Sequence, residues 1–279
     1  MTSTDEKRRA FRALHQDGCF VLPNPWDAGT ARALQRAGFR ALATTSAGFA
    51  FSRGLPDGAV GCQEMLAHVR ELVAATPLPV NADLEDGYGA TAEEVAANVR
   101  ACVDAGVAGL SIEDATGDPA APLYPADEAV ARLRAARRAI DAAGGGVVLT
   151  GRSEGFVAGR PDLAETIRRL VAYAEAGADC LYAPGLTARD QVAAVVRAVA
   201  PRPVNVLAGG PAFTVAELAA LGVRRVSVGS ALARAAWGAF LEASREIAER
   251  GTFERLGDAP GYAALNALLR PDAAQGHGA

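Results

Sequence analysis

Residues 79–114, PVNADLEDGYGATAEEVAANVRACVDAGVAGLSIED, decide the fold of this chain. The segment begins with an apolar strand-like run at 79–83 and passes through an acidic turn into a helical pattern over 91–105. Gly106 then ends the helix, because glycine readily takes the left-handed cap conformation, and a second strand-like run follows at 108–112. A strand, a helix and a strand in this order predict a parallel βαβ unit.

The same alternation extends along the whole chain. Strand-like runs are expected at 19–23, 41–45, 79–83, 108–112, 146–150, 179–183, 203–207 and 225–228. Helical patterns are expected at 4–16, 27–37, 62–75, 91–105, 126–143, 161–176, 187–199, 213–221 and 230–249. Eight such units without a linker predict a single α/β domain, a (β/α)₈ TIM barrel over 1–269, with a tail at 270–279 that we expect to be disordered. An open doubly wound sheet is the alternative, and the lack of a GxGxxG motif after the first strand disfavours it.

Composition excludes several classes of protein. The chain has 279 residues, of which 50% are hydrophobic, and a formal net charge of −4, which gives no electrostatic footprint for nucleic acid or an acidic membrane. The charged N-terminus is not typical of a signal peptide, and no run approaches the roughly 18 apolar residues that cross a bilayer. The 4 cysteines are scattered and predict neither a disulfide framework nor a zinc site. We expect a cytoplasmic protein without nucleic-acid or membrane partners.

Acidic residues gather where two predicted strands end, which is where barrels place their chemistry. Asp83 and Glu85 are two positions apart, so on an extended chain they would share a face, and Glu113 ends the neighbouring strand. Unpaired carboxylates at one mouth would repel each other. An oxygen-only ligand set favours Mg²⁺, with Mn²⁺ as the alternative ion. The other interpretation is that these acids pair with arginines such as Arg152, or lie on a solvated loop.

Other side chains exclude some mechanisms. His15 and His68 fall in predicted helices and His277 in the tail, so none is expected to act as a general base or triad member. Lys7 is the only lysine and precedes the predicted barrel, which argues against a Schiff-base mechanism.

Several motifs taken together resemble the isocitrate lyase/phosphoenolpyruvate mutase superfamily, over roughly residues 10–250. The matching pieces are NPWDAGTAR (24–32), TSAG (45–48), GLPD (54–57), ADLEDGYG (82–89), IED (112–114), GRSE (151–154) and AGAD (176–179). No single piece is decisive, but their order and spacing are specific. The resemblance is to methylisocitrate lyase-like members in particular.

The resemblance implies a small oxyacid substrate bound to Mg²⁺. It implies that the metal is held, in part through water, by Asp83, Glu85 and Glu113, with Asp57 contributing from the loop after the second strand. Arg152 is implied to polarise the oxygen that becomes an enolate. Together with the strand-end positions, the resemblance assigns substrate contacts to Ser46, Ala47, Gly48, Arg152, Glu154 and Asn205.

Members of the family also pair subunits by exchanging the last barrel helix. The resemblance therefore implies a homo-oligomer, a dimer or a homotetramer, in which 230–249 packs on a neighbouring copy.

The loop after the fourth strand departs from the family pattern. Isocitrate and methylisocitrate lyases carry a Lys-Lys-Cys-Gly-His type signature there, in which the Cys is the catalytic acid/base, whereas residues 114–125 read DATGDPAAPLYP. The Lys, Asn and Ser of phosphoenolpyruvate mutase are also missing. Asp118 and Tyr124 remain as the candidates for proton transfer. The alternatives are that Gly-Asp-Pro only makes a turn and that Tyr124 only anchors the loop.

These observations lead to one main hypothesis and two alternatives. The main hypothesis is a Mg²⁺-dependent lyase that cleaves a C–C bond of a small 2-hydroxy or 2-oxo (di)carboxylate through an enolate. The first alternative is a C–P bond enzyme similar to phosphoenolpyruvate mutase or phosphonopyruvate hydrolase. The second is a barrel that binds a metal and an oxyacid without turnover.

Overall fold

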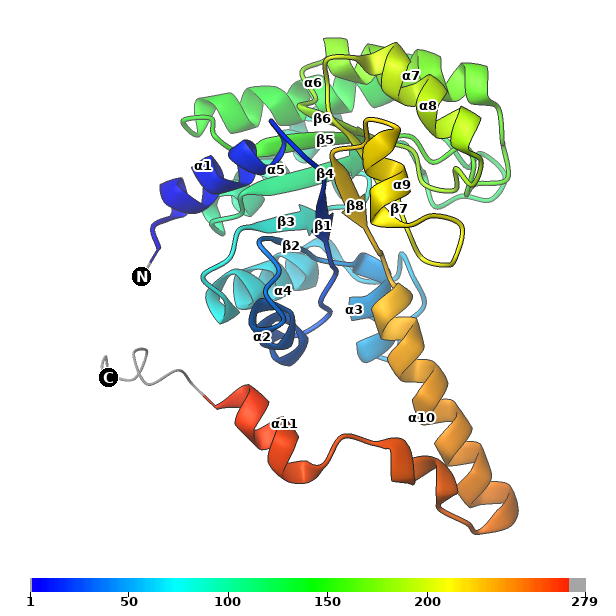
Figure 1. The fold of residues 1–279 in the computed structure, drawn as a ribbon. Helices are drawn as coiled ribbons and strands as arrows, with labels where there is room; N and C mark the ends of the chain where they lie inside the picture. The colour runs from blue at the N-terminus through cyan, green and yellow to red at the C-terminus, as the bar shows by residue number, and fades with distance from the viewer. Residues whose placement is uncertain (1, 271–279) are drawn as a thin grey trace.

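Eight parallel strands form the centre of the computed structural model, which describes residues 2–270 (Figure 1). They are β1 (Phe20–Leu22), β2 (Leu42–Ala43), β3 (Val80–Asp83), β4 (Gly109–Glu113), β5 (Val148–Arg152), β6 (Cys180–Tyr182), β7 (Val204–Leu207) and β8 (Arg225–Ser227). The hydrogen-bonded order is β1-β8-β7-β6-β5-β4-β3-β2, and Ala43 N donates to the Pro23 carbonyl at 3.0 Å, which links β2 to the chain just after β1. The predicted barrel is therefore confirmed and the open sheet is wrong.

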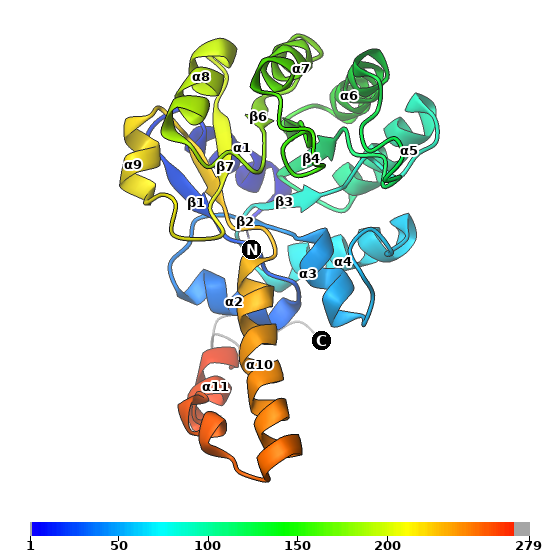
Figure 2. The same cartoon turned by 90° about the vertical axis from the view of Figure 1, so that its right-hand side faces the viewer.

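Helices alternate with the strands and surround them (Figure 2). They are α1 (Thr4–Leu14), α2 (Ala28–Arg36), α3 (Ser46–Ser52), α4 (Cys62–Ala75), α5 (Ala92–Asp104), α6 (Ala126–Ala142), α7 (Leu163–Glu175), α8 (Arg189–Val199), α9 (Val215–Ala220), α10 (Ala231–Arg250) and α11 (Tyr262–Leu269), with a 3₁₀ helix at Glu254–Asp258. The cap signals work as expected: Thr91 begins α5 in a capping box with Glu94, and Gly106 follows it with φ +88°.

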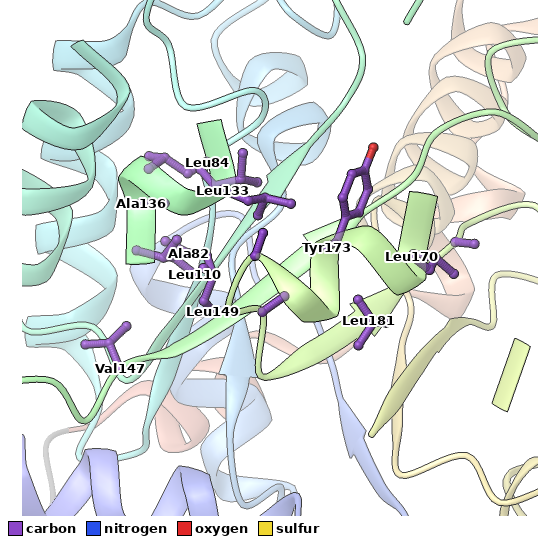
Figure 3. Packing of buried hydrophobic residues seen from close by; sticks show 14 of the residues in the cluster. Ala82, Leu84, Leu110, Leu133, Ala136, Val147, Leu149, Leu170, Tyr173 and Leu181 are labelled. Carbon is purple, nitrogen blue, oxygen red and sulfur yellow. The ribbon is translucent and has the colours of Figure 1, made fainter. Parts of the chain in front are cut away.

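The main core lies between the strands and the helices outside them. Leu110 and Leu149 from β4 and β5 pack with Leu133 of α6 and Tyr173 of α7, all buried (Figure 3). A smaller cluster closes the N-terminal end of the barrel, where Phe11 of α1 packs on residues at or next to the strand starts. This packing leaves the carboxyl ends of the strands as the open end of the barrel.

Helix α10 differs from the helices before it, because it runs away from the barrel in both views (Figures 1 and 2). Large apolar side chains stay exposed along it, namely Leu232, Trp237, Phe240, Leu241 and Ile247. The chain then returns through α11, where Arg36 of α2 donates to the Ala267 carbonyl at 3.0 Å. Within residues 2–270, no helix is long and apolar enough to cross a membrane. The predicted disordered tail falls, beyond Arg270, outside the described residues.

Candidate active site

A cavity of about 150 Å³ lies inside the barrel and opens at the carboxyl ends of the strands. It is lined by several side chains that the sequence singled out, namely Ser46, Ala47, Asp57, Asp83, Arg152 and Asn205. It is also lined by polar residues that were not selected, among them Asn24, Thr44, Tyr182, Arg225 and Ser227. The predicted end of the barrel therefore holds the candidate site.

Arg152 lines this cavity and contacts three carboxylates, of which Asp83 also belongs to the lining and Glu113 and Glu154 do not. Its residue position on β5 pairs in register with Glu113 on β4, and Arg152 Nη1 lies 2.9 Å from Glu113 Oε2 and 3.3 Å from Asp83 Oδ1. Its Nη2 donates to Glu154 Oε2 at 3.1 Å, and its Nε also contacts Glu154. Asp83 and Glu113 therefore pair with Arg152, as the alternative interpretation of the acids expected, whereas Glu85 does not. One guanidinium can balance the charge of only one of its three carboxylate partners when all are ionised.

Burial acts against the charges of this cluster. It raises the pKa of Glu113 well above its usual range, with Glu154 and Asp83 adding to the effect and Arg152 opposing it. Burial opposes the charge of Arg152 as well, but Glu113 and Glu154 hold its pKa well above the ordinary value. The cluster as it stands is therefore short of positive charge.

The backbone of Glu85 has a different conformation from the extended one that we expected. The extended chain ends at Asp83, and Glu85 has φ +44°, a left-handed conformation that non-glycine residues rarely adopt. The inference that Asp83 and Glu85 share a face of an extended chain was therefore wrong. Glu85 Oε1 is nevertheless buried without a hydrogen-bond partner. Burial raises the pKa of Glu85 to about 7, with Asp83 and Asp57 adding to the shift and the Tyr88 hydroxyl opposing it.

The four predicted metal ligands, Asp57, Asp83, Glu85 and Glu113, suit a divalent cation in their chemistry but not as a set of direct ligands. Among the residues that the structure describes, no three His, Cys, Asp or Glu side chains are grouped so that all could bind one metal ion directly. The donor set still fits a cation held partly through water, because the donors are all carboxylates, they exceed the positive charge of Arg152, and Glu85 Oε1 lacks a partner. Burial and the neighbouring Asp83 also raise the pKa of Asp57.

Ser46 and its neighbours begin α3, a helix that the sequence analysis did not predict. Ser46 N and Oγ both donate to Asp83 Oδ2, at 3.1 and 2.9 Å. Gly48 N donates to Thr45 Oγ1 at 3.2 Å as part of the helix cap, and Gly48 does not line the cavity. Of the three predicted substrate contacts here, Ser46 and Ala47 therefore face the cavity.

Glu154 and Asn205 occupy different places. Glu154 is buried, lies outside the cavity lining and contacts Arg152, so it positions that guanidinium. Its backbone N–H donates to Asp114 Oδ1 at 2.7 Å. Asn205 lines the cavity, and its Nδ2 donates to Ser227 Oγ at 2.9 Å.

The loop candidates for proton transfer lie away from the cavity lining. Tyr124 Oη donates to Asp86 Oδ2 at 2.7 Å, and the Arg132 guanidinium lies 3.8 Å from its ring centre. Asp118 is exposed, and its Oδ1 accepts from Ala120 N at 2.8 Å, as in a turn. These contacts agree with the alternative interpretations, in which Tyr124 anchors the loop and Asp118 forms part of a turn.

Tyr182 is the phenol that does line the cavity. It ends β6, it is buried, and the Arg152 guanidinium carbon lies 5.2 Å from its ring centre. Burial raises its pKa to about 12, so the hydroxyl keeps its proton at neutral pH. Its place at the end of the sixth predicted strand was the available signal for selecting it.

Comparison with known proteins gives matches over most of the chain. The family model for phosphoenolpyruvate phosphomutase matches residues 11–248. An uncharacterised protein of Mycobacterium tuberculosis is 34% identical over 93% of this chain and 96% of its own length. The 2-methylisocitrate lyase of Escherichia coli is 33% identical over 64% of this chain and 62% of its own. An oxaloacetate decarboxylase of Paraburkholderia xenovorans is 30% identical over 82% and 76%.

Solved structures agree in fold. A putative lyase/mutase from Burkholderia cenocepacia superimposes with a TM-score of 0.92 at 53% identity, over 95% of this chain and 96% of that one. A phosphonopyruvate hydrolase in complex with oxalate and Mg²⁺ superimposes with a TM-score of 0.83 at 27% identity, over 94% of each chain.

Proposed function

The chain belongs to the phosphoenolpyruvate phosphomutase family, and the relatives described above include two enzymes that cleave C–C bonds. We therefore propose that it is a Mg²⁺-dependent lyase. The proposed reaction cleaves a C–C bond of a small 2-hydroxy or 2-oxo (di)carboxylate. The observation that carries the proposal is the position of Arg152, which lines the cavity while Asp83, Glu113 and Glu154 hold its guanidinium in place.

Arg152 suits the chemistry of an enolate. When the bond between the third and fourth carbons of a 2-oxo acid breaks, the electron pair stays on the third carbon and is shared with the C2 carbonyl, so negative charge develops on the C2 oxygen. A fixed guanidinium in a shielded cavity stabilises that charge. Because three carboxylates fix the side chain beforehand, little reorganisation is needed as the charge develops. When bound, Mg²⁺ would supply further positive charge to the same oxygen, held by Asp57, Asp83, Glu85 and Glu113.

Tyr182 is the group we propose for proton transfer. Tyr182 belongs to the lining of the same cavity, and its pKa of about 12 keeps its hydroxyl protonated and able to donate. It would return a proton to the enolate after cleavage. Tyr124 is proposed to anchor the loop through Asp86, and Asp118 to form its turn.

The positions of Arg53 and Arg160 give no support to phosphonate chemistry. A phosphonate carries more charge than a carboxylate and needs cations around it. Arg53 pairs with Glu64 at 2.8 Å on the surface, and Arg160 lines a separate cavity next to α7. Neither contributes to the lining around Arg152.

We also propose that the protein forms a homo-oligomer through α10. The support is the row of exposed apolar side chains on a helix that leaves its own barrel (Figure 2).

The experiment is an assay of pyruvate and glyoxylate release with Mg²⁺ over a panel of 2-hydroxy, 2-oxo and phosphono acids. Asp83→Ala protein is the blank and Asp118→Ala the matched control, which should keep full activity. We expect Mg²⁺-dependent release of pyruvate or glyoxylate from an acid that contains no phosphorus, and we expect the Asp83→Ala protein to lack this activity. Phosphate release from phosphonopyruvate alone would move the enzyme to C–P chemistry. If no acid in the panel is cleaved but oxalate binds tightly in the presence of Mg²⁺, the result would support a barrel that binds a metal and an oxyacid without turnover.

A further inference from the structure

The cavity continues from its acidic mouth to a buried arginine at its floor. Arg225 is the first residue of β8, is only 2% exposed and belongs to the lining of the same cavity as Arg152. Its register partner on β1 is Phe20, which packs against Phe11 at the closed end of the barrel. Arg225 therefore lies deep in the barrel, whereas Arg152 ends β5 at the open end.

All the polar partners of Arg225 are neutral. Its Nε donates to Asn205 Oδ1 at 2.9 Å and its Nη2 to Thr150 Oγ1 at 3.0 Å. Its Nη1 lies 3.3 Å from His15 Nε2. His15 Nδ1 lies 2.8 Å from the Phe11 carbonyl, so this nitrogen carries the proton and Nε2 accepts. Burial and the charge of Arg225 lower the pKa of His15 to about 3, which keeps the ring neutral.

Arg225 differs in this respect from the other buried arginines of the described chain. Arg132 lies within 4 Å of both Asp86 and Glu128, and Arg169 pairs with Asp114 and Glu165. Within residues 2–270, no carboxylate lies at ion-pairing distance from Arg225. Buried charges in proteins are normally paired, because removing an ion from water without a counter-charge is strongly unfavourable.

The remaining donors around Arg225 point to the missing counter-charge. A guanidinium has five N–H bonds, and the three contacts above leave two of them for another acceptor. Asn205 is held with its oxygen on Arg225 and one amide N–H on Ser227, which leaves its second N–H. The floor is therefore rich in donors, and no carboxylate approaches its cation.

We propose that this floor is an anion site, in which Arg225 and Asn205 bind the distal carboxylate of the substrate. The proposal rests on the proposed function, which places the reacting 2-oxy or 2-oxo carboxylate end at Arg152. It deepens that function by assigning a dianionic substrate with one acid group at each end. The cavity of about 150 Å³ is smaller than the roughly 300–1,000 Å³ pockets that hold drug-sized ligands, so the acid must be short.

A purely structural role for Arg225 makes a different prediction. Through His15 the arginine also ties the end of α1 to the barrel, so its loss should lower stability under either interpretation. Only the anion site predicts that its loss changes which acids bind. The test must therefore compare ligands that differ in the distal carboxylate alone.

The experiment is calorimetry on the Mg²⁺-loaded protein with two matched pairs of acids, lactate with malate and 2-hydroxybutyrate with 2-hydroxyglutarate. The two lengths allow for the distance between the ends of the cavity. We expect at least one dianion to bind tenfold or more tightly than its monoanion. In Arg225→Gln this ratio should fall to about one, with the monoanion affinity unchanged. Arg197→Gln, which removes an exposed arginine from α8, is the matched control and should keep the ratio.

Two results would overturn the proposal. The first is a wild-type protein that prefers neither dianion, and this measurement needs no variant to fold. The second is a preference that survives unchanged in Arg225→Gln or, should that variant not fold, in Asn205→Asp, which keeps an oxygen acceptor for Arg225 but places a negative charge beside the proposed carboxylate.

Oxalate binding separates this proposal from the proposed function. Oxalate has no carbon chain between its two carboxylates, so we expect it to report on the mouth alone. If oxalate binding depends on Mg²⁺ but no dianion is preferred, the result would contradict the proposed floor site and leave the proposed function standing. A wild-type preference for a dianion without Mg²⁺-dependent oxalate binding would support the floor site and contradict the metal-dependent function.

Discussion

Arg152 Nη1 lies 2.9 Å from Glu113 Oε2, and the two residues are direct register partners on β5 and β4. The pairing places a cation at the centre of an acidic barrel mouth and fixes its orientation from two sides, because Glu154 contacts its Nε and Nη2. A guanidinium is suited to this place, since its planar fork meets several carboxylates at once.

Arg152→Lys should lower kcat/KM by about 10²-fold for any substrate of the proposed lyase, because one ammonium cannot meet Glu113, Glu154 and the enolate oxygen together. Steady-state kinetics on the acid identified in the panel would measure it. Arg197→Lys on the exposed face of α8 is the control. Activity within threefold of wild type in Arg152→Lys would contradict the role given to the guanidinium.

Glu85→Gln should stabilise the metal-free protein at pH 8. The pKa of Glu85 is raised from 4.5 to about 7, so burying its charge destabilises the fold progressively above pH 4.5 and most above pH 7. The neutral amide avoids this penalty, by about 1–3 kcal/mol after allowance for partial exposure. Urea unfolding with a chelator at pH 8 and pH 4 measures the difference, which should vanish at pH 4. Glu249→Gln, on an exposed position of α10, should show no such pH dependence. A less stable Glu85→Gln at pH 8 would refute the prediction.

Tyr182→Phe should reduce kcat by about 10²-fold while leaving Mg²⁺-dependent oxalate affinity unchanged. The phenyl ring keeps its packing near Arg152 but has no proton to donate. Tyr124→Phe is the matched control, because its hydroxyl contacts Asp86 outside the cavity lining, and it should keep kcat while losing some stability. The opposite pattern, with Tyr124→Phe inactive and Tyr182→Phe active, would return the proton transfer to the loop.

Local sequence signals were sufficient for most of the fold. The helix predicted at 62–75 is α4 (Cys62–Ala75), and the eight strand runs differ from the observed strands by only a few residues at each end. Helix α3 was missed because its seven residues, mostly Ser, Ala and Phe, are too few to show a clear helical period. Helix α10 was found as an element, but a periodic pattern does not state which surface covers its apolar side chains.

The site was predictable only as far as strand-end positions reach. Asp83, Glu113 and Arg152 end their strands as expected and meet at one mouth. Glu85 lies in a turn and has a positive φ, and glutamate is not a residue type that predicts this conformation. Arg225 lies at a strand start, where barrel residues usually serve stability, so position alone gave no reason to select it.

Phe240→Asp should dissociate the protein into smaller species. Phe240 is 59% exposed on α10 and packs edge-to-face with Trp237, with ring centres 5.5 Å apart, so the pair presents an apolar surface with no cover from its own barrel. If a second copy covers this surface, a buried aspartate there costs several kcal/mol. The dissociation constant should then rise at least ~100-fold, since about 1.4 kcal/mol corresponds to tenfold. Light scattering during gel filtration at micromolar concentration measures the mass, with Glu249→Ala as the control on the same helix. An unchanged mass in Phe240→Asp, or a monomeric wild type, would show that α10 does not pair the subunits.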